Sequence, residues 1–248
     1  YKEHDHDGGE KTFLGRKGNF NGEEIIKIIC EQPATARFIS RHLYHFFVAD
    51  EPPVPSWPYN DPQDVEAISI LERTYFDSGY DIGEMIRVLF NSDFFKSEKC
   101  HYKKIKSPAE LAGNVLRTTG EFGMPNIRIS ERNSQVAFMG QQLLNPPSVE
   151  GWHTGKEWID SGTLIERINF VADQVGNTDL PGIRAIIDRL AAMGPLTPEQ
   201  FVDGCLDLIG PVQATEKTRN QLVSFVGEVE DLRGDTEATN PEFSNKVA

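Results

Sequence analysis

The chain has 248 residues, a formal net charge of −13 at pH 7 and a pI of about 4.9. This length is enough to bury a full hydrophobic core, and the hydrophobic fraction of 38% and charged fraction of 25% are typical of a globular protein. The acidic balance argues against nucleic acid as a partner, because a negative surface repels phosphate groups. An integral membrane segment is also excluded, since no apolar run approaches the roughly 20 residues that span a bilayer.

Helical patterns begin at residue 22 and follow one another along the chain. In EEIIKIICEQ, the apolar residues Ile25, Ile28 and Ile29 recur at helical spacing. In PATARFISRHLYHFFVAD, Pro33 suits the first turn of a helix whose apolar stripe continues to the phenylalanines at 46–47. The next segment, EPPVPSWPYNDP, holds five prolines in twelve residues. This density excludes a helix or a central strand and predicts a long ordered loop.

Start signals mark several later helices. Asp81 and Ser107 each precede a helical pattern and have a glutamate three residues on, at the capping-box position. Such a cap stabilises a helix start by about 1 kcal/mol. Further helices are predicted over residues 65–79, 133–145, 163–176, 180–194, 196–210 and 215–234.

These patterns predict a mainly α fold. We expect a multi-helix domain with long loops rich in proline, glycine and tryptophan, and at most a short strand near the N-terminus, in KTFLG. Three parts are expected: a helical domain over 1–176, a three-helix extension over 177–233 and a tail over 234–248. The tail is predicted to be disordered because it has few large apolar residues. The first residue is tyrosine rather than methionine, so we expect a processed chain or a fragment of a longer one.

The segment HDHDGGEKTFLG, at residues 4–15, concentrates ionisable side chains ahead of the first apolar run. Imidazole and carboxylate groups bind zinc, iron and manganese, and carboxylates also suit calcium and magnesium. His4, His6 and Asp7 are therefore candidate ligands of a divalent metal, and His6, Asp7 and Lys11 are candidate catalytic residues. The alternative is a turn in which Asp7 accepts backbone N–H bonds and His6 packs. We favour this structural interpretation, because no second cluster of ligands matches the first.

His42 and His45 lie three residues apart in RHLYHFF, on one face of the predicted helix. This spacing can bring two imidazoles to one metal ion. The sharpest metal hypothesis joins His6 and Asp7 to His42 or His45. Because the adjacent phenylalanines make the face apolar, histidines packed in or beside the core are the favoured alternative.

Three further residues are candidate binding residues. Trp152 and Trp158 lie in the loop NPPSVEGWHTGKEW, where exposed tryptophan rings could stack on a sugar or on a partner's side chain. The favoured alternative is that both rings pin the loop onto the helical core. Arg37 could hold an anionic group beside the HDHDGGEK segment, or it could pair with Asp7. Lys11 is a candidate for the same two roles.

Five stretches in this order resemble the carboxy-terminal half of the bacterial domain-of-unknown-function family 1800: HDHDGGEKTFLG, QPATARFISRHLYHFFV, IKSPAELAGNVLR, MGQQLLNPPSVEGW and KEWIDSGTLIERINF. The resemblance covers residues 4–176. The positions that carry it are His6, Asp7, Lys11, Gly15, Pro33, Ala36, Arg37, Lys106, Ser107, Pro108, Glu110, Arg117, Gly140, Pro146, Pro147, Gly151, Trp152, Trp158 and Arg167.

The resemblance implies where the protein acts and what accompanies it, but it implies no reaction. It implies a helical amino-terminal half upstream of this chain, and export from the cell. It also implies a sulfatase-like neighbour family, number 1501, as a protein partner. It supplies no reaction and no catalytic residues, so whether the chain is an enzyme stays open.

Two functions are consistent with these observations. The favoured one is a non-catalytic exported component that binds another protein or a cell-surface polymer. It is favoured because the chain has no GxSxG elbow, HExxH motif, phosphate-binding loop or dinucleotide-binding glycine fingerprint. The alternative is a metal-dependent hydrolase that uses the HDHDGGEK segment.

Overall fold

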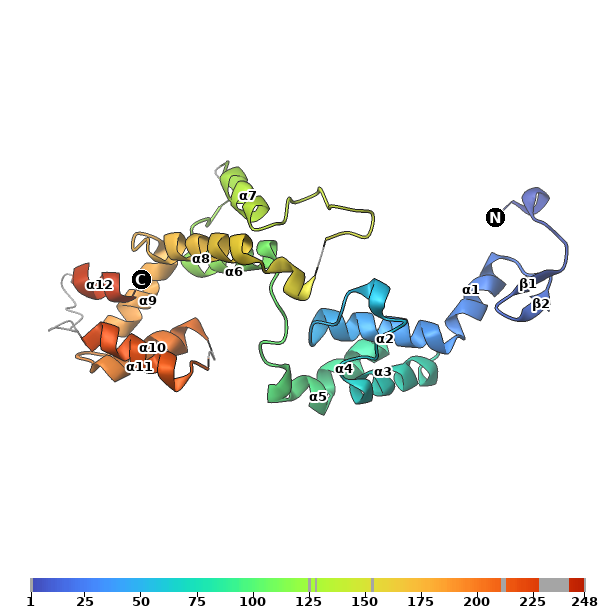
Figure 1. The fold of residues 1–248 in the computed structure, drawn as a ribbon, viewed down its shortest axis with the longest axis horizontal. Coiled ribbons are helices and arrows are strands. Elements are labelled where there is room, and N and C mark those ends of the chain that lie inside the picture. Colours follow the sequence, from blue (N-terminus) through green and yellow to red (C-terminus); the bar gives the residue numbers. More distant parts are fainter. Residues whose placement is uncertain are drawn as a thin grey trace. The chain divides into compact units, whose positions relative to one another are not determined.

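The computed structural model describes residues 2–124, 126–127, 129–152, 154–210, 213–227 and 241–247. The chain divides into two compact units, Tyr1–Ile105 with His153–Lys156, and Lys106–Trp152 with Glu157–Ala248. Helices make up most of both units, so the predicted mainly α fold is confirmed (Figure 1). No helix in the described ranges is long and apolar enough to cross a membrane.

The predicted short strand is one arm of a β-hairpin. Strands β1 (Lys11–Phe13) and β2 (Arg16–Gly18) pair antiparallel, and they follow a short 3₁₀ helix, η1 (Glu3–Asp5). The two residues between the strands, Leu14 and Gly15, both have positive φ, at 45° and 81°. Two successive positive φ values are typical of the tight turns whose twist matches that of paired strands.

The remainder of the first unit is helical. Its elements are α1 (Gly22–Cys30), α2 (Pro33–Phe47), η2 (Val54–Ser56), α3 (Val65–Asp77), α4 (Ile82–Asn91), α5 (Asp93–Lys96) and η3 (Glu98–Cys100). Helix α2 packs along α3, and α3 packs against α4 (Figure 1). The core between them includes Ile68, Leu71, Met85 and Leu89, each at most 2% exposed. Each such side chain contributes about 1.5–3 kcal/mol through burial.

Local caps begin several of these helices as predicted. The Ser107 hydroxyl accepts from the Glu110 N–H, and the Glu110 carboxylate accepts from the Ser107 N–H, which completes the predicted capping box. Asp81 also caps its helix, by accepting from the Glu84 N–H. The Glu84 carboxylate, however, lies 3.0 Å from Arg87 Nε. Asp81 is therefore a cap, and its predicted capping-box partner forms a surface ion pair.

The proline-rich segment after α2 is the ordered loop that the sequence predicts. Its backbone is held by Arg41, whose Nη1 donates to the carbonyls of Trp57 at 3.2 Å and Asn60 at 2.8 Å. The indole of Trp57 donates to the Pro52 carbonyl at 2.7 Å. These bonds replace the ladder or helix bonds that proline cannot make.

The helices of the second unit are α6 (Pro108–Thr119), α7 (Ile129–Phe138), α8 (Ser161–Val175), α9 (Pro181–Ala191), α10 (Pro198–Ile209), α11 (Glu216–Gly227) and α12 (Pro241–Val247). The short 3₁₀ helix η4 (Gly155–Trp158) is divided, with its first two residues in the first unit and its last two in the second. Helix α6 packs against α7, α8 and α9. One core cluster joins α6, α7 and α8, and another joins α9 to α12.

The division of the chain into its two units falls at 105–106 along the sequence. Within the second unit, α9, the first helix after residue 176, packs directly on α6. An added Cβ at Gly182 of α9 would lie 1.9 Å from the Thr118 carbonyl oxygen of α6. The predicted extension is therefore packed onto the same unit as α6, because the glycine allows two backbones to approach closely.

Two element predictions are corrected by the structure. Helix α7 ends at Phe138 rather than at 145, since the chain turns at Gly140, where φ is 102°. The predicted disordered tail includes a helix, α12, whose Phe243 is 1% exposed and packs 5.4 Å from the ring of Phe201. Residues 234–240 of that predicted tail lie outside the described residues.

Candidate functional site

The HDHDGG segment is organised as a turn joined to the β-hairpin. Asp7 Oδ1 accepts from the Gly9 N–H at 2.9 Å. Lys11 Nζ donates to the carbonyl oxygens of Asp7 and Gly9, the latter at 3.3 Å, and to Asn19 Oδ1 at 3.2 Å. This is the turn that the structural alternative predicts, in which the Asp7 carboxylate accepts a backbone N–H bond. The Lys11 amino group binds backbone oxygens instead of facing an open site.

The histidines of the same segment contact their own neighbourhood. His4 Nε2 lies 3.5 Å from Asp5 Oδ1, with both side chains exposed, and His6 Nε2 lies 3.3 Å from the Phe20 carbonyl oxygen. Among the described residues, no group of three or more histidine, cysteine, aspartate or glutamate side chains is placed to hold one metal ion. The geometry therefore gives no support to a site that joins His6 to His42 or His45.

His42 and His45 take part in the packing of the proline-rich loop. The His42 ring packs against the rings of Phe38 and Trp57, at centroid distances of 4.4 and 4.7 Å, and burial lowers the pKa of His42. His45 Nδ1 accepts from the Glu51 N–H at 2.9 Å. Burial lowers the pKa of His45, with Lys104 adding to the effect. A lowered pKa favours the neutral ring, which is the form that can accept this bond.

The three predicted binding residues lie in different surroundings. Arg37 forms an ion pair with Glu72, with Nε 2.9 Å from Oε1, rather than with Asp7. Trp158 is only 6% exposed, and its carbonyl accepts from the Thr163 hydroxyl. Trp152 is half-buried, and its buried indole N–H has no hydrogen-bond partner among the described residues. Burial of Trp158 removes its ring from any exposed stacking surface.

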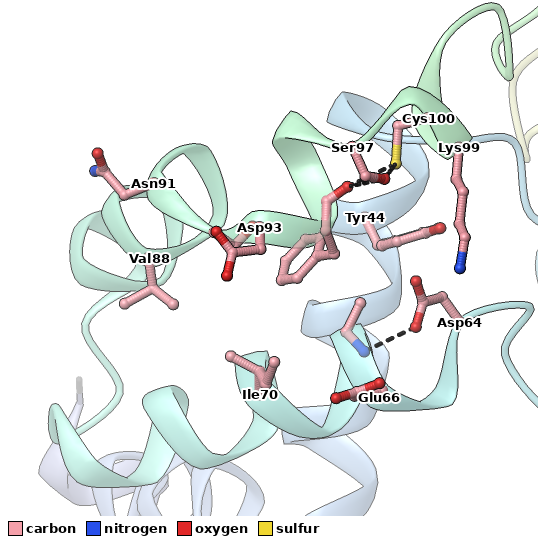
Figure 2. A pocket seen from close by; sticks show the side chains of 13 residues that line it. Tyr44, Asp64, Glu66, Ile70, Val88, Asn91, Asp93, Ser97, Lys99 and Cys100 are labelled. Atoms are coloured by element: carbon pink, nitrogen blue, oxygen red, sulfur yellow. Dashed lines mark hydrogen bonds between the residues drawn. The ribbon is translucent and has the colours of Figure 1, made fainter.

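A cleft of about 710 Å³ opens on the first unit, between α2, α3, α4, α5 and η3 (Figure 2). Its walls combine apolar groups with charged ones. The residues that line it are Tyr44, Asp64, Glu66, Ala67, Ile70, Val88, Asn91, Ser92, Asp93, Phe94, Ser97, Lys99 and Cys100.

The charged groups of the cleft are mainly carboxylates. The lining contains three carboxylates, of Asp64, Glu66 and Asp93, and one ammonium group, of Lys99, so its formal charge is −2. Asp64 also caps α3, with Oδ1 accepting from the Ala67 N–H at 2.9 Å. None of the three carboxylates forms an ion pair within the described part of the chain. Their charge is thus available to a ligand.

Tyr44 contributes the one deeply buried polar side chain among the residues that line the cleft. The residue is 5% exposed, and its hydroxyl has no hydrogen-bond partner among the described residues. Figure 2 shows the hydroxyl directed toward the end of the cleft where Asp64 and Lys99 lie. Burial raises the pKa of Tyr44, and the carboxylates of Asp64 and Glu51 add to the effect. The hydroxyl therefore stays neutral and retains both its donor and its acceptors.

The thiol in the cleft is not arranged as a nucleophile. Cys100 Sγ donates to the Phe94 carbonyl at 2.9 Å and lies 3.8 Å from the Ser97 hydroxyl. Ser97 in turn donates to the same carbonyl at 3.0 Å. A reactive thiol or hydroxyl needs an adjacent general base, and neither group bonds to one here.

No motif in the sequence marks this cleft. Its residues come from positions 44 to 100, and the packing of α3 against α2 and α4, and of α4 against α5, brings them together. The weak signal available was the run SDFFKSEKC, in which charged residues and a cysteine surround two phenylalanines.

The fold and the cleft together define a mainly α protein with an acidic, partly apolar cleft. A family model described as a protein of unknown function (DUF1800) matches residues 1–243, and the chain belongs to this family. The match reaches the last helices, so the expected limit of the resemblance at residue 176 was too short. Neither a curated protein nor a solved structure matches the chain.

Proposed function

We propose that this chain is a non-catalytic binding component that engages its partner through the cleft of the first unit. The observation that carries the proposal is the large cleft, in whose wall the Tyr44 side chain is 5% exposed and its hydroxyl has no hydrogen-bond partner among the described residues. A tyrosine hydroxyl can both donate a hydrogen bond to a ligand and accept one from it. Clefts with apolar walls and a few convergent polar groups are typical binding sites.

The cellular setting is part of the proposal. Export and a sulfatase-like protein partner are implied by the family resemblance, and the proposal adopts both. A cell-surface polymer is the other partner class that an exported binding component would meet. The proposal also includes an upstream helical segment, as the resemblance implies.

The experiment compares what co-purifies with the tagged protein from its native bacterium. Ile70→Arg places a long charged side chain in the cleft, and Ile26→Arg makes the same change at an exposed position of α1, 62% exposed and outside the cleft. Circular dichroism establishes that both variants keep their helical content. We expect a protein or envelope polysaccharide to co-purify with the wild type and with Ile26→Arg, and to be lost with Ile70→Arg.

Two results would contradict the proposal. One is that the wild-type protein brings down neither a protein nor an envelope polysaccharide. The other is that a folded Ile70→Arg variant retains every partner of the wild type, since binding would then take place away from the cleft.

A further inference from the structure

We infer that the Arg167 guanidinium binds a small carboxylate anion beside the start of α6. Arg167 belongs to the second unit, whereas the cleft lies on the first, so this inference goes beyond the proposed function and is independent of it. It follows from the hydrogen bonds of Arg167, from its charge and from its place beside α6.

Arg167 presents a pair of buried donors that no described residue accepts from. The residue lies in α8 and is 7% exposed. Its Nη1 donates to the Lys106 carbonyl oxygen at 2.9 Å, while its Nε and Nη2 are buried and have no partner in the described part of the chain. Nε and Nη2 form one edge of the planar guanidinium, and the two N–H groups of such an edge match the two oxygens of a carboxylate.

A second arginine of the same unit shows what this edge binds. Arg132 uses its Nε and Nη2 to bind the two carboxylate oxygens of Glu121, with Nε 3.0 Å from Oε2. Arg132 and Arg167 present the same donors, and Arg132 has a carboxylate partner where Arg167 has none among the described residues. A carboxylate is therefore the group that fits the Arg167 edge.

The charge of the guanidinium favours a monovalent anion. Burial lowers the pKa of Arg167, whereas a neighbouring carboxylate would raise it. Glu110, at the start of α6, uses its carboxylate to accept from the Ser107 N–H and does not pair with Arg167. A buried cation is costly unless it is paired. One carboxylate balances one guanidinium, while a divalent anion such as sulfate would bring a second buried charge that has no partner.

The start of α6 adds a favourable field. Lys106, whose carbonyl accepts from Arg167, directly precedes Ser107, the N-cap of α6. The N-terminal end of a helix carries a partial positive charge, which stabilises an anion. The first N–H donor of the helix, that of Ala109, is already bonded to Gln141 Oε1. The helix therefore contributes its dipole, and Arg167 supplies the hydrogen bonds.

Burial limits the size of the ligand. Nε and Nη2 of Arg167 are both covered by surrounding atoms, so an anion reaches them only when neighbouring side chains move aside. Protein interiors are close-packed, and a carboxylate of one or two carbons requires the least displacement. Formate and acetate are the probes that match this site.

The test follows the Arg167 side chain itself. Its Nε–H signal in the ¹H–¹⁵N spectrum of the full labelled chain is assigned by through-bond correlation to the backbone. Sodium formate, acetate, sulfate and chloride are then titrated separately at constant ionic strength. We expect a saturable shift with formate and acetate, at least about tenfold weaker binding of sulfate, and no saturable shift with chloride.

Thermal unfolding gives a second readout, because a ligand that binds only the folded chain raises its stability. We expect acetate to raise the unfolding midpoint of the wild type above its value in chloride at the same ionic strength, and to leave that of Arg167→Met unchanged. Arg167→Lys keeps the charge but lacks the two-donor edge, and it should weaken acetate about tenfold or more. The matched control, Arg184→Met, removes an exposed arginine that pairs with Asp179 and should respond to acetate as the wild type does.

Three results would overturn the inference. The first is an Nε–H signal of Arg167 that shows no saturable shift with formate or acetate. The second is a response to chloride or sulfate as strong as that to acetate, since the site would then not select a carboxylate. The third is a rise of the midpoint in acetate that persists in Arg167→Met, because the anion would then bind elsewhere. The first two are measured on the wild type and decide the inference even where a variant fails to fold.

Discussion

The guanidinium Nη2 of Arg41 lies 2.5 Å from Glu51 Oε2, and the two side chains are 1% and 0% exposed. This buried ion pair joins α2 to the proline-rich loop. Arg41 also donates to two carbonyls of that loop, and Glu51 Oε1 accepts from the Gln63 N–H at 3.0 Å. Because almost every polar atom of the pair is bonded, the network can fix one conformation of a segment that has no regular backbone bonds.

Removing one member of this pair should be strongly destabilising. Arg41→Met leaves the Glu51 carboxylate buried without its cation, and we expect a loss of about 3–5 kcal/mol in the free energy of unfolding. Arg37 is the matched control, since it lies one turn away on the same helix and pairs with Glu72 while its side chain is 56% exposed. Arg37→Met should cost less than about 1 kcal/mol. Urea denaturation of the wild type and the two variants measures both losses in the free energy of unfolding. Equal losses for Arg41→Met and Arg37→Met would contradict the stabilising role given to the buried pair.

Arg167 is the opposite case, a buried cation that no carboxylate of the described residues pairs with. Arg132 uses its Nε and Nη2 to bind Glu121, whereas the same two nitrogens of Arg167 are buried and have no partner in the described part of the chain. Its Nη1 donates to the Lys106 carbonyl at 2.9 Å. We expect Arg167→Met to raise the free energy of unfolding by about 1–2 kcal/mol, because an apolar side chain fills the site without an unpaired charge.

Arg132→Met serves as the comparison for that substitution and should lower stability, since it leaves the mostly buried Glu121 carboxylate unpaired. Thermal unfolding monitored by circular dichroism ranks the three proteins. A lower midpoint for Arg167→Met than for the wild type would show that its guanidinium contributes favourably despite the two unbonded nitrogens.

The stability of the first unit should fall as pH falls below about 6.5, the ordinary pKa of histidine. The pKa values of His42 and His45 are lowered in the folded state, chiefly by burial. Between these lowered pKa values and pH 6.5, the two histidines bind more protons in the unfolded chain than in the folded chain. The free energy of unfolding is therefore unaffected by them above pH 6.5 and decreases as the pH falls below that value. Protonation of His45 Nδ1 would also break the bond from the Glu51 N–H.

Denaturation at pH 7.5 and pH 5.5 measures this effect. His45→Gln removes one titrating group and should reduce the difference between the two pH values. His4→Gln, at a side chain that is 78% exposed, should leave the difference as it is in the wild type. An unchanged difference in His45→Gln would show that His45 is not responsible.

Two glycine substitutions should have opposite effects. Gly182→Ala places a Cβ 1.9 Å from the Thr118 carbonyl oxygen, so α9 must move away from α6, at a cost of about 1–3 kcal/mol. Gly113→Ala, on the exposed side of α6, meets no atom within 4 Å and should raise stability by about 0.5–1 kcal/mol through helix propensity. Denaturation of both variants tests the close packing of α6 and α9.

The metal-dependent hydrolase alternative is decided by the metal content of the protein. Elemental analysis of protein purified from its native source without chelators is compared with a His6→Ala/Asp7→Ala variant. We expect no stoichiometric metal in either, because Lys11 and Asp7 bond within the turn and no three-ligand group occurs among the described residues. Stoichiometric metal that vanishes in the variant would support the hydrolase and direct a screen of esters and phosphates.

Local features of this chain were predictable from its sequence. Ser107 with Glu110 marks the start of α6, Pro33 lies in the first turn of α2, and the proline-rich segment is a loop. The interactions that decide these features join residues within about four positions of one another. The family resemblance was also recognisable, because its motifs are continuous stretches.

The candidate site was decided by tertiary structure alone. Tyr44, Asp64 and Lys99 line one end of the same cleft only because segments of the chain that are distant in sequence fold together there, and no local pattern encodes that arrangement. The same holds for Phe243, whose burial against Phe201 orders α12 within a polar segment. Helix starts depend on hydrogen bonds that neighbouring residues complete, whereas burial and the pairing of distant charges depend on the whole packed chain.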